Sequence, residues 1–97
     1  MTQPSVSDVA QTFAVLARGV EVREQVRAFL EAQHQAGSIV DFRLPEPRGR
    51  FLEVRVYLEL DAYDDLERRE HLRGRLDGFS TGDILVHGVV LVRFPDA

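Results

Sequence analysis

The clearest pattern in the chain is an alternation of apolar and mixed positions between Phe51 and Leu60. Successive side chains of a β-strand point to opposite faces of a sheet, so this alternation predicts a strand with one aliphatic and one mixed face. The aliphatic face consists of Leu52, Val54, Val56, Leu58 and Leu60. We expect helices to cover this aliphatic face and to leave the mixed face open.

Two apolar stripes precede this strand. The stripe at Val22, Val26, Phe29 and Leu30 has helical spacing and predicts a helix from residue 21 to residue 36. Upstream, a second stripe favours a helix that begins near residue 8 and ends at Gly19. Its members are Val6, Val9, Phe13, Leu16, Ala17 and Val20. The unbroken apolar run over residues 13–17 leaves a short strand over residues 12–18 as the alternative. Because the two stripes lie far apart around one helical cylinder, we expect a kink or a change of structure near Gly19.

The remaining elements are two further strands and a helix. Residues 38–44 alternate, and two prolines and a glycine make residues 45–50 a loop. We predict the register of the antiparallel hairpin formed by this strand and the strand that begins at Phe51 from the best match of charges. In this register Phe42 lies opposite Val54, Asp41 opposite Arg55 and Arg43 opposite Glu53. A helix is predicted over residues 61–76. The last strand, residues 84–94, is apolar on both faces, which favours cover on both sides, and Gly88 is expected to mark a bulge.

These elements predict a single α+β domain over residues 1–97, with residues 1–7 disordered and residues 21–94 forming the core. We expect a two-layer sandwich, with an antiparallel sheet, both helices on one face and an αββαβ core. If residues 12–18 form a strand, the plan becomes βαββαβ, which is ferredoxin-like. An open face this apolar is seldom left in water, so we expect a second copy, or less often a ligand, to cover it. The predicted interface residues are Ile39, Phe51, Tyr57, Leu85, Val89 and Leu91.

Composition narrows the function classes. The chain of 97 residues has a formal net charge of −4, whereas nucleic-acid-binding domains usually carry a basic patch, so no nucleic-acid partner is expected. It contains no cysteine, which excludes disulfides, thiolate nucleophiles and cysteine-based metal sites. Its apolar runs are far shorter than the ~20 residues of a membrane span. We therefore expect a cytoplasmic protein.

Two histidines are the main candidates for chemistry. His71 shares a predicted helix face with Glu67, and His87 lies in the last strand. Without cysteine, a divalent metal such as zinc needs histidines and carboxylates that converge, so the candidate metal ligands are His71, His87 and Glu67. The alternative is an exposed, ion-paired helix and a half-buried structural histidine. Ser80 and Thr81 have no recognisable base partner, so no catalytic residue is predicted.

The predicted second helix also carries several arginines, whose positions are Arg68, Arg69, Arg73 and Arg75. Acidic residues at positions 67, 70 and 77 dilute this local basic patch. We therefore expect a solvated helix here in preference to an anion site.

From Val22 onward the chain resembles the cytoplasmic C-terminal domain of cation diffusion facilitator transporters. The resemblance rests on the strand within PRGRFLEVRVYLELD, on Leu66 and His71 in the following helix, and on the final strand opening DILVH. It implies an αββαβ order, a homodimer, and zinc or a similar ion bound at the subunit junction. The chain departs from the family at Tyr57, where a histidine is common, and at Val89, where an acidic residue is expected. The resemblance therefore supports dimerisation of this chain more strongly than metal binding. We expect the protein to be a free-standing relative of that domain.

A second resemblance belongs to another class of protein. The segment TFAVLARG followed by a helix resembles dimeric ferredoxin-like enzymes of the antibiotic-biosynthesis monooxygenase type. This alternative implies a small aromatic substrate held between the sheet and the helices. The acid and aromatic pair expected in the third strand of such enzymes is missing from this sequence. We therefore favour a non-catalytic homodimerising module with a regulatory or metal-responsive binding role.

Overall fold

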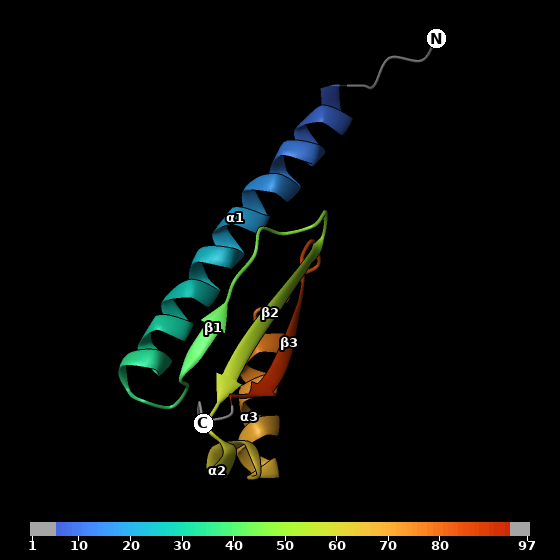
Figure 1. Cartoon of the computed structure of the whole chain (residues 1–97). Coiled ribbons are helices and arrows are strands. Elements are labelled where there is room, and N and C mark those ends of the chain that lie inside the picture. Colours follow the sequence, from blue (N-terminus) through green and yellow to red (C-terminus); the bar gives the residue numbers. More distant parts are fainter. Residues whose placement is uncertain (1–5, 94–97) are drawn as a thin grey trace.

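The computed structural model describes residues 6–93, and it describes side chains from residue 14 onward except that of residue 15. Figure 1 shows one long helix and a short helical layer beside a three-stranded sheet. The elements are α1 (Val6–Gln35), β1 (Asp41–Arg43), β2 (Phe51–Leu58), α2 (Leu60–Tyr63), α3 (Leu66–Asp77) and β3 (Leu85–Val92). The predicted α+β class and the αββαβ order are confirmed, with α2 as an additional short turn of helix before α3.

The sheet is mixed, with the strand order β1-β2-β3. Strand β2 pairs antiparallel with β1 and parallel with β3. The expectation of a wholly antiparallel sheet was therefore wrong for the last strand. Helix α3 carries the chain from the end of β2 back to the level where β2 began, and a helical crossover of this kind joins parallel neighbours.

The hairpin pairs two residues away from the predicted register, with Phe42 opposite Val56 instead of Val54. A shift of two residues keeps every side chain on its predicted face. The chain turns at Gly49, whose φ of 60° suits glycine, and Arg48 pairs with Phe51 in an isolated bridge. Residues 44–47 are thereby left to run towards α1 without strand pairing.

Helix α1 continues through Gly19 as one helix, so the predicted kink at that position was wrong. The strand alternative for residues 12–18 was also wrong, and the full βαββαβ plan does not form. Gly19 is buried, and a Cβ placed there would lie 3.4 Å from Ile84 Cδ1 and 3.8 Å from Pro47 Cγ. The glycine therefore allows close packing of the helix against two other segments, and it does not end the helix.

The two apolar stripes of α1 consequently have different surroundings. The stripe from Val22 to Leu30 packs on the sheet, whereas Leu16 and Val20 of the upstream stripe are 59% and 62% exposed. Figure 1 shows the N-terminal part of α1 projecting past the sheet. The radius of gyration is 16.6 Å, compared with ~13 Å for a compact domain of about 100 residues. The upstream stripe residues Val6, Val9 and Phe13 lie outside the described side chains.

The core lies between the even-numbered face of β2 and the helices. Its fully buried aliphatics include Leu52, Val54, Val56 and Leu58 of β2, Val22, Val26 and Leu30 of α1, and Leu76 of α3. Gly88 of β3 lies directly under α3, since a Cβ there would come within 2.9 Å of Leu76 Cδ1. The strand register passes through Gly88 without interruption, so the predicted bulge was wrong and the glycine instead allows close packing.

Ile39 is a correction to the predicted interface. It is only 2% exposed and belongs to the core, although the alternation placed it on the open face. Strand β1 begins at Asp41, so Ile39 lies in the turn after α1 and is free of strand alternation. Within the described residues, α1 is the only long helix, and neither it nor any other is apolar enough over a sufficient length to cross a membrane.

Candidate functional site

The sheet face opposite the helices is the candidate functional surface, and we call it the open face. It is formed by Asp41 and Arg43 of β1, Phe51, Glu53, Arg55 and Tyr57 of β2, and Leu85, His87, Val89 and Leu91 of β3. These residues share one face because neighbouring strands are in register and side chains alternate. The predicted interface residues lie on this face, apart from Ile39.

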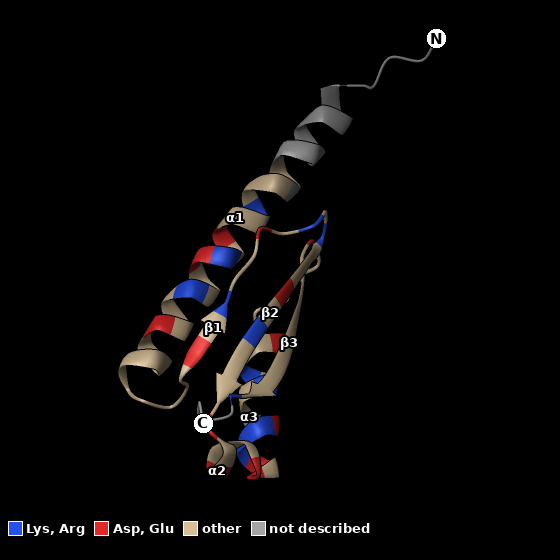
Figure 2. Ribbon diagram, in the orientation of Figure 1, with Lys and Arg blue, Asp and Glu red and all other residues tan. Residues whose placement is uncertain are grey.

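The β3 side of the open face is apolar. Strand β3 carries no acidic residue and no lysine or arginine, as its uniform colour in Figure 2 shows. Leu85 is 57% exposed and its neighbour Phe51 is 39% exposed, while Val89 and Leu91 are half-buried. The His87 ring stacks on Phe51 with a centroid separation of 6.2 Å and an interplanar angle of 26°. An exposed leucine, phenylalanine and imidazole on adjacent strands form a surface suited to contact with another molecule.

The β1 side of the open face carries charges of alternating sign. Arg43 Nη1 donates to Asp41 Oδ2 at 2.8 Å, and Arg55 Nε donates to Glu53 Oε1 at 3.2 Å. The backbone N–H of Phe42, helped by Arg43, lowers the pKa of Asp41 below its ordinary value. Both pairs run along a strand, not across the hairpin as predicted, because the register places Arg43 opposite Arg55.

A groove of about 680 Å³ lies beside these charges, between β2 and the loop that precedes it. Its floor is formed by the open-face side chains of β2, and its wall includes Leu44, Pro45, Glu46 and Arg48. This volume falls within the ~300–1,000 Å³ typical of sites for small molecules. The residues of its floor also belong to the open face, so the groove and the open face form one continuous surface.

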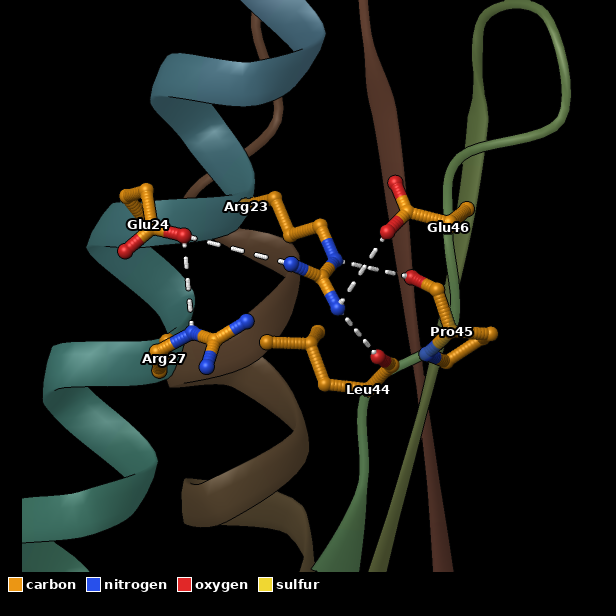
Figure 3. A network of polar contacts seen from close by, with 6 residues as sticks. All are labelled: Arg23, Glu24, Arg27, Leu44, Pro45 and Glu46. Atoms are coloured by element: carbon orange, nitrogen blue, oxygen red, sulfur yellow. Dashed lines mark hydrogen bonds and ion pairs between the residues drawn. The ribbon is translucent and has the colours of Figure 1, made fainter.

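Arg23 of α1 holds the wall of this groove in place (Figure 3). Its guanidinium donates to the carbonyl oxygens of Leu44, at 2.9 Å, and Pro45, at 3.2 Å, and lies 3.8 Å from a carboxylate oxygen of Glu46. The Arg23 side chain is only 17% exposed. Hydrogen bonds from a charged donor in a partly dry environment are stronger than neutral ones. Arg23 therefore fixes residues 44–46 against α1 and is a positioning residue for the groove.

The outer edge of β3 is partly closed by side chains. The backbone N–H of Val86 donates to Ser80 Oγ at 2.9 Å, and the backbone N–H of Gly88 donates to Asp77 Oδ1 at 3.3 Å. Ser80 Oγ also donates to the carbonyl oxygen of Val86 at 3.2 Å. Exposed edge strands recruit other strands, and proteins commonly block them. Here the first half of the β3 edge is already occupied by the turn that follows α3.

The predicted metal ligands do not come together within one chain. His71 lies on α3, in the helix layer, whereas His87 lies on the open face on the other side of the sheet. Across residues 6–93 as described, no three histidine, aspartate or glutamate side chains are grouped closely enough to hold a metal ion. The expectation of one site built from His71, His87 and Glu67 was therefore wrong for the single chain. Spacing along the sequence could not reveal which side of the sheet α3 would cover.

Sequence reasoning missed Arg23 and the edge-blocking residues Ser80 and Asp77. Arg23 looks like one more charged residue on a helix, and the sequence gives no sign that its partners are backbone atoms some twenty residues away. Ser80 was considered only as a nucleophile. Its place in a turn just before a strand was the available signal, because serine hydroxyls often satisfy nearby backbone groups.

No family model matches the chain, and no match is found among curated proteins or solved structures. The resemblance to the cation diffusion facilitator domain therefore stays a prediction.

Proposed function

We propose that this protein is a non-catalytic homodimerising module, in which the open face of one chain binds the open face of a second copy. The observation that carries the proposal is the exposure of Leu85 and Phe51 beside the uncharged strand β3. Burying such side chains is favourable by about 25 cal/mol per Å² of apolar surface.

The charges of the open face favour a second copy over an unrelated partner. Asp41, Arg43, Glu53 and Arg55 contribute two positive and two negative charges, and the signs alternate along each strand. A two-fold axis through such a pattern can set each arginine beside a carboxylate of the other chain without accumulating charge of one sign. A strongly charged partner would gain no net attraction from this face.

The partly blocked edge of β3 disfavours extension of the sheet at that edge. Two copies joined along the first half of β3 would have to displace the hydrogen bonds that Ser80 and Asp77 make with Val86 and Gly88. The open face needs no such rearrangement.

The size of the sheet indicates that other surface also contributes. The three strands have 3, 8 and 8 residues, and at roughly 3.3 Å per residue and roughly 4.8 Å per strand they give a projected area of about 300 Å². A standard interface buries about 800 Å² per partner. The loop residues Leu44 and Pro45 in the wall of the groove adjoin this face and offer further surface.

Sedimentation equilibrium of two matched leucine variants tests the proposal. Leu85 on the open face is 57% exposed, and Leu66 on α3 is 60% exposed, so a lysine at either position is compatible with the folded monomer. At micromolar concentration we expect the wild type and Leu66→Lys to sediment near twice the 11.0 kDa of one chain, 2 × 11.0 = 22.0 kDa. We expect Leu85→Lys to sediment as a monomer. A monomeric wild type, or dissociation only in Leu66→Lys, would contradict the proposal.

The fold bears on two alternatives that the sequence left open. The enzyme alternative requires a first strand over residues 12–18, and those residues belong to α1. A metal-responsive role would need ligands from two copies, because His71 and His87 of one chain lie on different sides of the sheet.

A further inference from the structure

A small cavity on the helix side of the sheet has an unusual charge composition. Its volume is about 180 Å³, and it lies where α3 meets α1 and the turn that follows α1. Its polar lining consists of Gln33, Ser38, Arg68, His71 and Arg75. The ionisable groups in this lining are two arginines and one histidine, and no carboxylate is among them, although the chain as a whole carries a net charge of −4.

The arrangement of charge around α3 explains this composition. At about 100° per residue, Arg68, His71 and Arg75 fall within about 60° of one another on the helix circumference. The acidic residues at positions 70 and 77 lie about 100° or more from these three, whereas Glu67 lies only about 40° from His71 and is not part of the cavity lining. The two arginines and the histidine therefore form a cationic face that Glu67 borders on one side. Arg73, which lies outside this face, pairs with Glu70 at 3.7 Å.

The two cavity arginines are held by contacts that leave most of their donors available. Arg68 Nη2 donates to the carbonyl oxygen of Ser38 at 3.3 Å, and the Arg75 guanidinium lies 5.0 Å from the centroid of the Phe29 ring. Within the described part of the chain, neither arginine forms an ion pair. A guanidinium has five N–H donors, and a contact with an aromatic face uses none of them.

We propose that this cavity binds a small oxyanion of the phosphate class. Arginine forks match the geometry of phosphate oxygens, and His71 and Gln33 supply further N–H donors while Ser38 supplies a hydroxyl. The cavity volume of about 180 Å³ is sufficient for a phosphate group, and Arg68, His71 and Arg75 are exposed at its mouth. The bound anion links α1 to α3 on the side of the sheet opposite the open face.

Titration with inorganic phosphate, followed by ¹H–¹⁵N NMR at constant ionic strength set with sodium chloride, tests this proposal. We expect saturable shifts of the side-chain Nε–H signals of Arg68 and Arg75 and of the backbone amide of Ser38. A parallel titration with glycerol 2-phosphate distinguishes an esterified phosphate from the free ion, since the natural ligand class binds the tighter of the two.

Single variants provide the control. We expect Arg68→Gln and Arg75→Gln to bind phosphate roughly tenfold more weakly or worse, because each loses a charged fork. Arg73→Gln removes the same charge from the same helix outside the cavity, and we expect its affinity to equal that of the wild type. Arg68→Lys keeps the charge without the fork and is expected to fall between Arg68→Gln and the wild type. Shifts that do not saturate, or an equal loss in Arg73→Gln, would overturn the proposal.

Discussion

The contact between Gly88 and Leu76 makes the packing of α3 on the sheet testable with one methyl group. In Gly88→Ala the new Cβ would lie 2.9 Å from Leu76 Cδ1 and 3.0 Å from Leu76 Cβ. A leucine can rotate its Cδ1 away, but its Cβ is fixed to the backbone. Carbon atoms normally pack at ~3.5–4.0 Å, so α3 must move away from β3 by several tenths of an ångström.

The expected magnitude is the difference of two effects. Overpacking of a core costs about 1–3 kcal/mol. Replacing glycine by alanine also restricts the unfolded chain, which recovers about 0.4–1 kcal/mol where the backbone conformation permits it. We therefore expect Gly88→Ala to lower the free energy of unfolding by about 1–2 kcal/mol. For a domain of this size, each kcal/mol corresponds to about 4–8 °C in Tm.

Urea and thermal unfolding at one fixed protein concentration provide the measurement, because dimerisation makes stability depend on concentration. Gly74→Ala is the matched control, since it adds the same methyl group to α3 at a position with nothing within 4 Å. It is expected to raise stability by about 0.5–1 kcal/mol through helix propensity. If Gly88→Ala were as stable as Gly74→Ala, the close approach of α3 to β3 would be refuted.

Two further perturbations probe the surroundings of the open face. We expect Arg23→Gln to lower the free energy of unfolding by about 1–2 kcal/mol and to speed tryptic cleavage after Arg48, because the hydrogen bonds between α1 and the loop at residues 44–46 are lost. Arg27 does not contact this loop, so we expect Arg27→Gln to leave the cleavage rate unchanged. Because the folded pKa of Asp41 is lowered, its carboxylate stabilises the fold above the unfolded pKa, and this contribution is lost as the pH falls through the folded pKa. Asp41→Asn should therefore be less stable than the wild type at neutral pH, with the difference vanishing in strong acid; an NMR titration of Asp41 that gave an ordinary or raised pKa would contradict this.

Local patterns were sufficient to predict most of the fold. The alternation predicted the buried face of β2 correctly from Leu52 to Leu58, but it was wrong for Leu60, which begins α2 and is 44% exposed. The stripe from Val22 to Leu30 predicted the packed part of α1. The faces of the hairpin survived a two-residue error in register, because side chains alternate with a period of two. What these patterns determine is the direction of a side chain relative to its own backbone.

Several of the wrong predictions concern contacts between distant segments. Gly19 and Gly88 looked like a helix end and a bulge, but each is a place where another segment approaches closely. Glycine has the same local signature in all these roles. The metal site predicted within one chain does not form for the same reason, because the path of α3 places His71 and His87 on different sides of the sheet. The placing of Arg68, His71 and Arg75 on one side of α3 was present in the sequence, but only the fold sets a cavity beside them.

The most direct test of the central claim is a filtered NOE experiment on an equimolar mixture of ¹³C-labelled and unlabelled chains, which detects only contacts between different copies. The account predicts intermolecular NOEs that involve the side chains of Phe51, Leu85 and Leu91 on the open face. Intermolecular NOEs confined to other surfaces such as α3, or none at concentrations where the protein is dimeric, would contradict it.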